Sequence, residues 1–451
     1  MRLIVIGLVS VAVLLPLVSE STVAAASPAI LALGLLAALA VAVLFRLGRP
    51  PEKDGDGTTG QSDRRFLVLL VLSGFVARVV VAIALRRLGL NQVIAPDELT
   101  FHNNGIVFSM WLRGETPYRL SYHHLDSLQV GYFYLVGTIY YLFGIQPILP
   151  ILLNCLVGSL AAIPVHRIAR DLHGREAART AAILVTFFPS VLLWSTMLLR
   201  DSLVVLLLMM IVVGVMELRK RFTLHNLVLL LGLLTLLGTL RQYLFLMVAG
   251  TAIASFVLGR TGRTAKSLVV SLLVIVALFS LMKVAGFGVW ELERASLFHL
   301  NQRRQYNALA TAAGSIAPEV DISKPIGALT YLPVGMAYFL GSPFPWQVLS
   351  TRQLVALPDV LVWYGLLPSI LLGLLHLIRR RFRDASMLLI TMTVITILYS
   401  LVEGNIGIIF RHRVQVIVPC MVLAGIGLAR LRERRAEKLA NLPGAAVGAP
   451  A

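Results

Sequence analysis

The chain has 451 residues, of which 58% are apolar and only 14% are charged, and its mean hydropathy is +0.84. Soluble domains are about 45–50% apolar and about 25% charged, so this composition excludes an ordinary soluble enzyme and a disordered tail protein. The formal net charge of +18 would suit a nucleic-acid partner. The placement of the basic residues indicates membrane topology instead, so we expect no nucleic-acid partner.

Long apolar stretches recur along the whole chain. A stretch of roughly 18 or more apolar residues can cross a bilayer as a helix, and about twelve reach that length. They are centred near Leu14, Leu35, Val76, Val157, Val185, Leu208, Leu231, Ala252, Val274, Leu367, Val394 and Val422. The sequence therefore predicts an all-α polytopic protein of the cell membrane.

Basic residues gather in the short connectors on one side of this threading. Examples are Arg167–Arg179, Arg219–Arg221 and Arg379–Arg383. Positively charged connectors stay in the cytoplasm, so both termini are predicted to be cytoplasmic.

Two long segments, 88–147 and 286–358, are then extracytoplasmic. Within them Val130–Phe143 and Ile326–Leu340 are semi-apolar, which predicts helices that lie along the membrane interface. The two cysteines, Cys155 and Cys420, lie inside apolar runs and predict no disulfide framework. We expect the chemistry of the protein on the outer side of the membrane.

The ends of the chain differ in composition from its main body, 64–435. Residues 48–63 are rich in Gly, Asp and Pro and predict a flexible cytoplasmic linker, which separates a two-helix membrane appendage, 1–47, from that body. The tail, 436–451, is rich in Ala, Gly and Pro and is predicted to be disordered and cytoplasmic. The first apolar run is followed by Ala24–Ala26, so an uncleaved span and a cleaved signal peptide both remain open.

Two adjacent carboxylates, Asp97 and Glu98, open the first outer segment directly after Pro96. Partial desolvation at a bilayer surface raises the pKa of a carboxylate and suits it to abstract a proton. The structural alternative is a helix N-cap at Asp97, because an aspartate directly after a proline is a typical start signal of a helix. Arg78, inside the preceding span, is a candidate counter-ion for Glu98. Asp201, at a later outer turn, carries the same two alternatives, chemistry or a cap.

Several arginines are predicted on the outer side, against the positive-inside trend. The candidates for binding a lipid phosphate are Arg241, Arg303, Arg304, Arg411 and Arg413. Arginine binds phosphate through a planar, bidentate fork, which favours it for this role. For Arg303 and Arg304, contact with solvent or lipid headgroups is the alternative. For Arg411 and Arg413, the alternative is an ion pair with Glu403.

Taken in order, these motifs resemble the GT-C superfamily of integral-membrane glycosyltransferases. The resemblance is nearest to the bacterial relatives of protein O-mannosyltransferases and to the aminoarabinose transferases that modify lipid A. It rests on Asp97–Glu98 at the first outer loop, on the block Leu153–Asp201, and on Arg411–Arg413 with Pro419 at the last span. The main body is therefore predicted to be a GT-C-like helical bundle with a catalytic role.

The resemblance implies a membrane glycosyltransferase of cell-envelope polysaccharide biosynthesis. Its donor would be a sugar on a polyprenyl phosphate, and its acceptor a glycan, a lipid-linked glycan or a protein hydroxyl on the extracytoplasmic face. The expected partners are this donor, this acceptor and membrane lipid. The resemblance also implies that Asp97, with Glu98 beside it, is the catalytic base and that Asp201 binds a metal or the acceptor.

The cofactor stays open. A divalent cation prefers hard oxygen ligands such as the carboxylates of Asp97, Glu98 and Asp201. Neither long outer segment carries an Asp-x-Asp motif, however, and some members of the superfamily work without metal.

Two rival functions also remain open. A polysaccharide polymerase or ligase of the O-antigen type would use outer arginines against a lipid pyrophosphate, without needing the Asp-Glu pair. A transporter or flippase would need charged residues along a central path, and the predicted spans have almost no acidic residues near their middle. The sequence favours the glycosyltransferase.

Overall fold

The computed structural model describes residues 57–115, 130–258, 272, 276–277, 296–309, 314–317, 319–347 and 351–440. Within these ranges the chain forms helices and turns and no β-strand, and an isolated antiparallel bridge joins Ser315 to Asn405. The predicted all-α class is therefore confirmed. Helices suit a membrane because each one satisfies its own backbone hydrogen bonds.

The described helices of the N-terminal part precede residue 259. They are α3 (Gly57–Arg87), α4 (Leu90–Ile94), α5 (Glu98–Leu112), α7 (Gly131–Phe143), α8 (Ile148–Leu160), α9 (Ala162–His173), α10 (Arg175–Phe187), α11 (Pro189–Trp194), α12 (Asp201–Lys220), α13 (Leu224–Leu240) and α14 (Gln242–Leu258). The C-terminal part consists of α17 (Leu297–Leu309), α18 (Pro325–Gly341), the 3-10 helix η1 (Pro345–Gln347), α19 (Thr351–Arg380), α20 (Phe382–Val402), α21 (Ile406–His412) and α22 (Val414–Ala440).

Six helical segments of the described chain are long and apolar enough to cross a membrane. They are Ser62–Arg87, Ile148–His173, Asp201–Lys220, Gln353–Arg380, Phe382–Val402 and Val414–Leu439. Each contains one predicted span centre, and together they confirm a polytopic helical membrane protein. The predicted interfacial pieces also form helices, α7 and α18.

The remaining predicted spans differ from these six. Leu231 and Ala252 lie in α13 and α14, which are apolar but only 17 residues long. Val185 lies in α10, which ends after 13 residues at Phe187 because Pro189 follows and cannot continue the hydrogen-bond ladder. The centres near Leu14, Leu35 and Val274 lie outside the described residues.

Two predicted boundaries shift. Helix α3 begins at Gly57, inside the predicted linker 48–63, and α22 continues to Ala440, inside the predicted tail 436–451. The residues at the start of that tail are strong helix formers, so the last span continues through them. The appendage 1–47 and residues 441–451 lie outside the described part of the chain.

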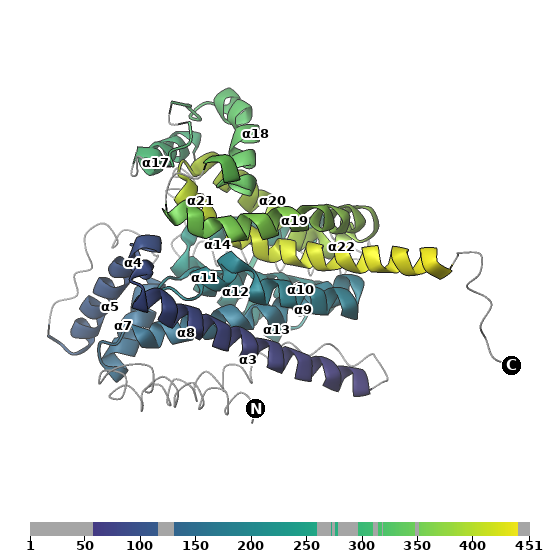
Figure 1. Cartoon of the computed structure of the whole chain (residues 1–451), viewed down its shortest axis with the longest axis horizontal. Helices are drawn as coiled ribbons and strands as arrows, with labels where there is room; N and C mark the ends of the chain where they lie inside the picture. The colour runs from purple at the N-terminus through teal and green to yellow at the C-terminus, as the bar shows by residue number, and fades with distance from the viewer. Residues whose placement is uncertain are drawn as a thin grey trace.

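Helices α19 and α22 lie side by side along the long axis of the molecule (Figure 1). A Cβ atom at Gly373 would collide with the carbonyl oxygen of Leu423, and one at Gly427 with that of Ser369. Small residues at these crossings let the two backbones approach closely, as in other membrane bundles. Helix α22 also packs on α9 and α10 and is buried over most of residues 414–429, so the short helix α21 before it is attached to a fixed position.

The two ends of the bundle hold different sets of charges. At one end Asp63 of α3 accepts hydrogen bonds from Arg170, Arg175 and Arg179 at 3.0, 2.7 and 3.0 Å. The predicted outer residues gather at the other end, where α4, α5 and α21 lie (Figure 1). The bundle therefore places the basic connectors at one end and the predicted outer residues at the other. This agrees with the predicted threading, in which the two kinds of segment alternate along the chain.

A labelling experiment tests the orientation of this bundle. Cysteines introduced by Glu319→Cys, at the end with α21, and Arg383→Cys, at the basic end, replace exposed side chains. An impermeant maleimide should modify the Glu319 position in intact cells and the Arg383 position only after permeabilisation, because basic connectors stay inside. The native Cys155 and Cys420 are buried and give little background. The reverse pattern would overturn the threading.

Candidate active site

Asp97 precedes α5 without capping it. Its carboxylate makes no capping hydrogen bond, which removes the structural alternative for this residue. Instead, Oδ2 of Asp97 accepts a hydrogen bond of 2.6 Å from Nη1 of Arg411, and the Asp97 side chain is 60% exposed. The first outer segment and the approach to the last span thus meet through one ion pair.

Arg411 contacts a second carboxylate on its other side. Its Nε donates to Oδ2 of Asp201 at 2.7 Å, while Nη2 of Arg241 donates to Oδ1 of Asp201 at 2.5 Å. The Asp201 side chain is only 2% exposed, so its charge is neutralised by two guanidinium groups rather than by water. Asp201 is therefore a buried junction between three segments and not a solvated helix cap.

His412 extends this network to Glu403. The Nη1 group of Arg241 lies 2.8 Å from Nε2 of His412, and arginine only donates, so Nε2 must be the acceptor. The ring proton then lies on Nδ1, which donates to Oε1 of Glu403 at 2.8 Å. Burial and the charge of Arg241 lower the pKa of His412 to about 4, so the ring is neutral at pH 7. Glu403 thus pairs with His412 and not, as the alternative held, with Arg411 or Arg413.

Two tyrosines and one exposed arginine border the network. The hydroxyl of Tyr243 accepts from Nη1 of Arg241 at 2.5 Å and lies 3.1 Å from the hydroxyl of Tyr399. The Tyr399 ring stacks on His412, with 4.9 Å between ring centroids. The guanidinium of Arg303, an exposed residue, lies 5.4 Å from the centroid of the Tyr243 ring. Sequence reasoning missed Tyr399, whose only signal is a tyrosine near the end of an apolar run.

Glu98 turns away from this cluster. Its Oε1 accepts from the backbone N–H of Leu198 at 2.6 Å and from Nη2 of Arg86 at 3.1 Å, and its Oε2 accepts from Asn91 at 2.9 Å. The counter-ion is therefore Arg86 and not the predicted Arg78. A carboxylate with both oxygens engaged is poorly placed to take a proton, so this geometry favours a positioning role for Glu98 over the predicted catalytic one.

Two of the predicted phosphate ligands, Arg304 and Arg413, are buried and point elsewhere. Arg304 donates to the carbonyl oxygens of Ile316, Ala317 and Val320 at 2.9, 2.6 and 2.9 Å. Arg413 donates to the carbonyl oxygens of Ser342 and Leu340 at 2.5 and 3.2 Å, and its Nη2 lies 3.4 Å from Oδ2 of Asp359. Buried carbonyls need donors, and these arginines supply them. These contacts argue against the predicted phosphate-binding role of both. Arg241 and Arg411 belong to the network, and Arg303 lies at its edge.

The expected cation would have to share ligands with these arginines. Asp97 and Asp201 face Arg411, and Glu98 faces Arg86. Among the residues that the structure describes, no group of three or more His, Cys, Asp or Glu side chains is placed to hold a metal ion. The question of a divalent cation at this site stays open, as it was from the sequence.

No protein-family model matches the sequence, and no curated protein matches it. Solved structures that are similar to the chain include the following two. One is ArnT from Cupriavidus metallidurans bound to undecaprenyl phosphate, with 18% identity, a TM-score of 0.46, and coverage of 80% of this chain and 61% of that one. The other is the Archaeoglobus fulgidus oligosaccharyltransferase in the apo form, with 16% identity, a TM-score of 0.46, and coverage of 82% and 52%. The chain thus spans less than two thirds of either protein, and the chemistry below is argued from its own residues.

The buried and exposed carboxylates should respond differently to the same substitution. Asp201→Asn leaves two guanidinium groups without their shared charge, and breaking a buried ion pair costs roughly 3–5 kcal/mol. Asp97→Asn removes a largely exposed pair, which contributes about 0–1 kcal/mol. Thermal unfolding of the purified protein in detergent should therefore show a large fall in Tm for Asp201→Asn and little change for Asp97→Asn. Equal values would contradict the assignment of Asp201 as the junction.

Proposed function

We propose that the chain is a membrane glycosyltransferase. It transfers a sugar from a polyprenyl-phosphate carrier to an acceptor hydroxyl at the extracytoplasmic face. One observation carries this proposal: the exposed carboxylate of Asp97 is held by Arg411, which is itself fixed by the buried Asp201. A proton acceptor and a phosphate-binding group thus stand side by side at one end of a membrane bundle.

Asp97 has the position that a general base needs. The acceptor hydroxyl loses its proton as its oxygen attacks the anomeric carbon, and a carboxylate within hydrogen-bond reach accepts that proton. Arg411 engages Oδ2 of Asp97 and fixes the orientation of the carboxylate. Oδ1 makes no hydrogen bond with the described residues and is free to meet the hydroxyl.

Arg411 has the position that a leaving phosphate needs. When the bond between the anomeric carbon and the phosphate oxygen breaks, the electron pair leaves with the phosphate, and a nearby guanidinium stabilises the growing charge. Nε and Nη1 of Arg411 bind the two aspartates, whereas Nη2 makes no hydrogen bond with the residues described. Arg303 offers a second exposed guanidinium at the edge of the site.

A lipid pyrophosphate donor, as in a polymerase or ligase, is the second candidate. The observation that favours it is the pair of guanidinium groups, Arg241 and Arg411, on the single carboxylate of Asp201. Such a pair concentrates positive charge, which a more highly charged donor would use. Assays with monophosphate and pyrophosphate carriers of the same sugar distinguish the two candidates.

Substitution of the proposed base tests the mechanism directly. Asp97→Asn is nearly isosteric, but the amide cannot accept the proton of the acceptor, so the transfer rate should fall about 10²–10⁴-fold. The measurement is transfer in proteoliposomes supplied with a panel of radiolabelled polyprenyl-phosphate sugars and membrane acceptors.

Glu319→Gln is the matched control for this variant. It removes one negative charge from an exposed side chain in the second long outer segment and should leave transfer unchanged. Near-normal transfer by Asp97→Asn, with an unchanged Tm, would remove the central argument for the glycosyltransferase.

A further inference from the structure

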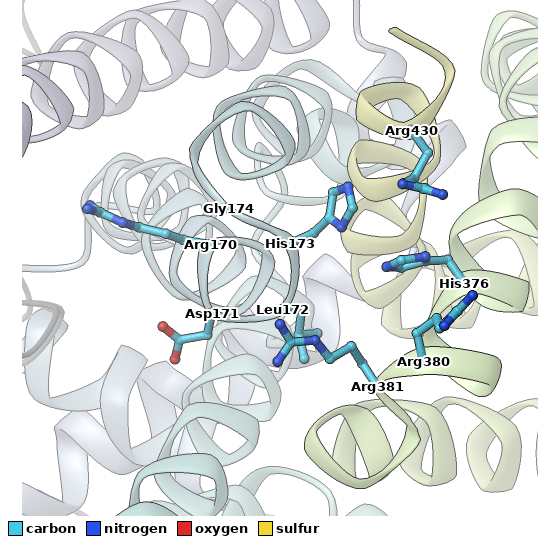
Figure 2. A pocket seen from close by; sticks show the side chains of 9 residues that line it. All are labelled: Arg170, Asp171, Leu172, His173, Gly174, His376, Arg380, Arg381 and Arg430. Atoms are coloured by element: carbon cyan, nitrogen blue, oxygen red, sulfur yellow. The ribbon is translucent and has the colours of Figure 1, made fainter. Parts of the chain in front are cut away.

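We propose that the basic end of the bundle binds the headgroup of an anionic phospholipid. A cavity of about 650 Å³ lies there between the turn that joins α9 to α10, the C-terminal end of α19 and the helix α22 (Figure 2). This cavity lies at the opposite end of the bundle from the candidate active site. The proposal of a lipid here does not depend on the function proposed for that site.

The cavity is strongly basic. Four arginines, two histidines and one carboxylate line it. Arg170 and Asp171 extend away from the centre (Figure 2) and pair with Asp63 at 3.0 Å and Lys220 at 2.7 Å. His173, His376, Arg380, Arg381 and Arg430 remain around the opening. These side chains surround a space large enough for a phosphate headgroup.

The guanidinium groups around the opening are only partly neutralised. Arg380 makes no ion pair or hydrogen bond with the described residues. Arg381 contacts Asp384 only at 3.4 Å, and both side chains are about half exposed. Arg430 pairs with Glu433 at 2.8 Å. Positive charge therefore exceeds negative charge at the opening, and planar guanidinium forks suit the oxygens of a phosphate.

A second crevice, of about 220 Å³, favours a lipid over a soluble anion. It adds Leu372, Leu375 and Leu431 to His376, Arg380 and Arg430, which it shares with the first cavity. Leu372 and Leu375 lie on α19, in the candidate span Gln353–Arg380, and Leu431 lies on α22. The apolar part of this candidate span is only 28% buried. An acyl chain would lie along the leucines while its headgroup meets the arginines, and basic sites between helices at a membrane face bind anionic headgroups in this way. A free phosphate would gain nothing from the leucines.

Native mass spectrometry of the full-length protein in detergent tests the proposal. The wild type should retain dioleoyl phosphatidylglycerol in preference to dioleoyl phosphatidylcholine. The double variant Arg380→Gln/Arg430→Gln should bind phosphatidylglycerol roughly thirtyfold more weakly, since each basic residue near a phosphate contributes to binding. Arg381→Gln, at an exposed position, should lose less affinity for phosphatidylglycerol. It replaces the double variant as the test if the double variant does not fold.

Arg383→Gln/Arg435→Gln is the matched control. It removes one charge from the first turn of α20 and one from α22, at exposed residues that do not line the cavity. If the basic residues only set topology, both double variants would bind phosphatidylglycerol equally, and that result would overturn the proposal. Equal binding of the two lipids by the wild type would also overturn it. Displacement of phosphatidylglycerol by millimolar inorganic phosphate would overturn the choice of a lipid and assign the cavity to a soluble anion.

Discussion

A carboxylate buried between two guanidinium groups holds together the end of the molecule that carries the candidate active site. Asp201 starts α12, Arg241 lies between α13 and α14, and Arg411 lies in α21, so three segments converge on one side chain. Burying any of these charges alone would be costly, and each offsets the cost of the others. The arrangement of the candidate active site therefore depends on Asp201 remaining ionised and enclosed.

This junction divides the site into a rigid part and an accessible part. Behind Arg411, the network continues through Arg241 and His412 to Glu403, where hydrogen bonds fix each side chain. In front of it, Asp97 is 60% exposed and touches the network through Arg411 alone among the described residues. A substrate would therefore meet a carboxylate and a guanidinium whose relative position is already set, which is the preorganisation that electrostatic catalysis requires.

The sequence predicted the spans better than the contacts of individual charges. Apolar length is a local property, so it located six helices long enough to cross. It overestimated where a proline interrupts the run after Phe187, and at α13 and α14, which are apolar but only 17 residues long. Asp97 and Glu98 could not be separated from sequence, because successive helical residues point about 100° apart and only the fold decides which one faces the site. The burial of Arg304 and Arg413 could not be predicted either, since no sequence pattern reveals which backbone carbonyls lie beside them.

Binding of the carrier tests the division of roles between Arg411 and Asp97 most directly. The measurement is the Kd of a polyprenyl phosphate without sugar for the wild type, Arg411→Lys and Asp97→Asn, each with its Tm recorded. Arg411→Lys keeps the charge but loses the bidentate fork, so the Kd should rise roughly tenfold, while Asp97→Asn should bind as tightly as the wild type. Unchanged binding by Arg411→Lys, together with a loss of binding in Asp97→Asn, would contradict the assignment of the phosphate to Arg411.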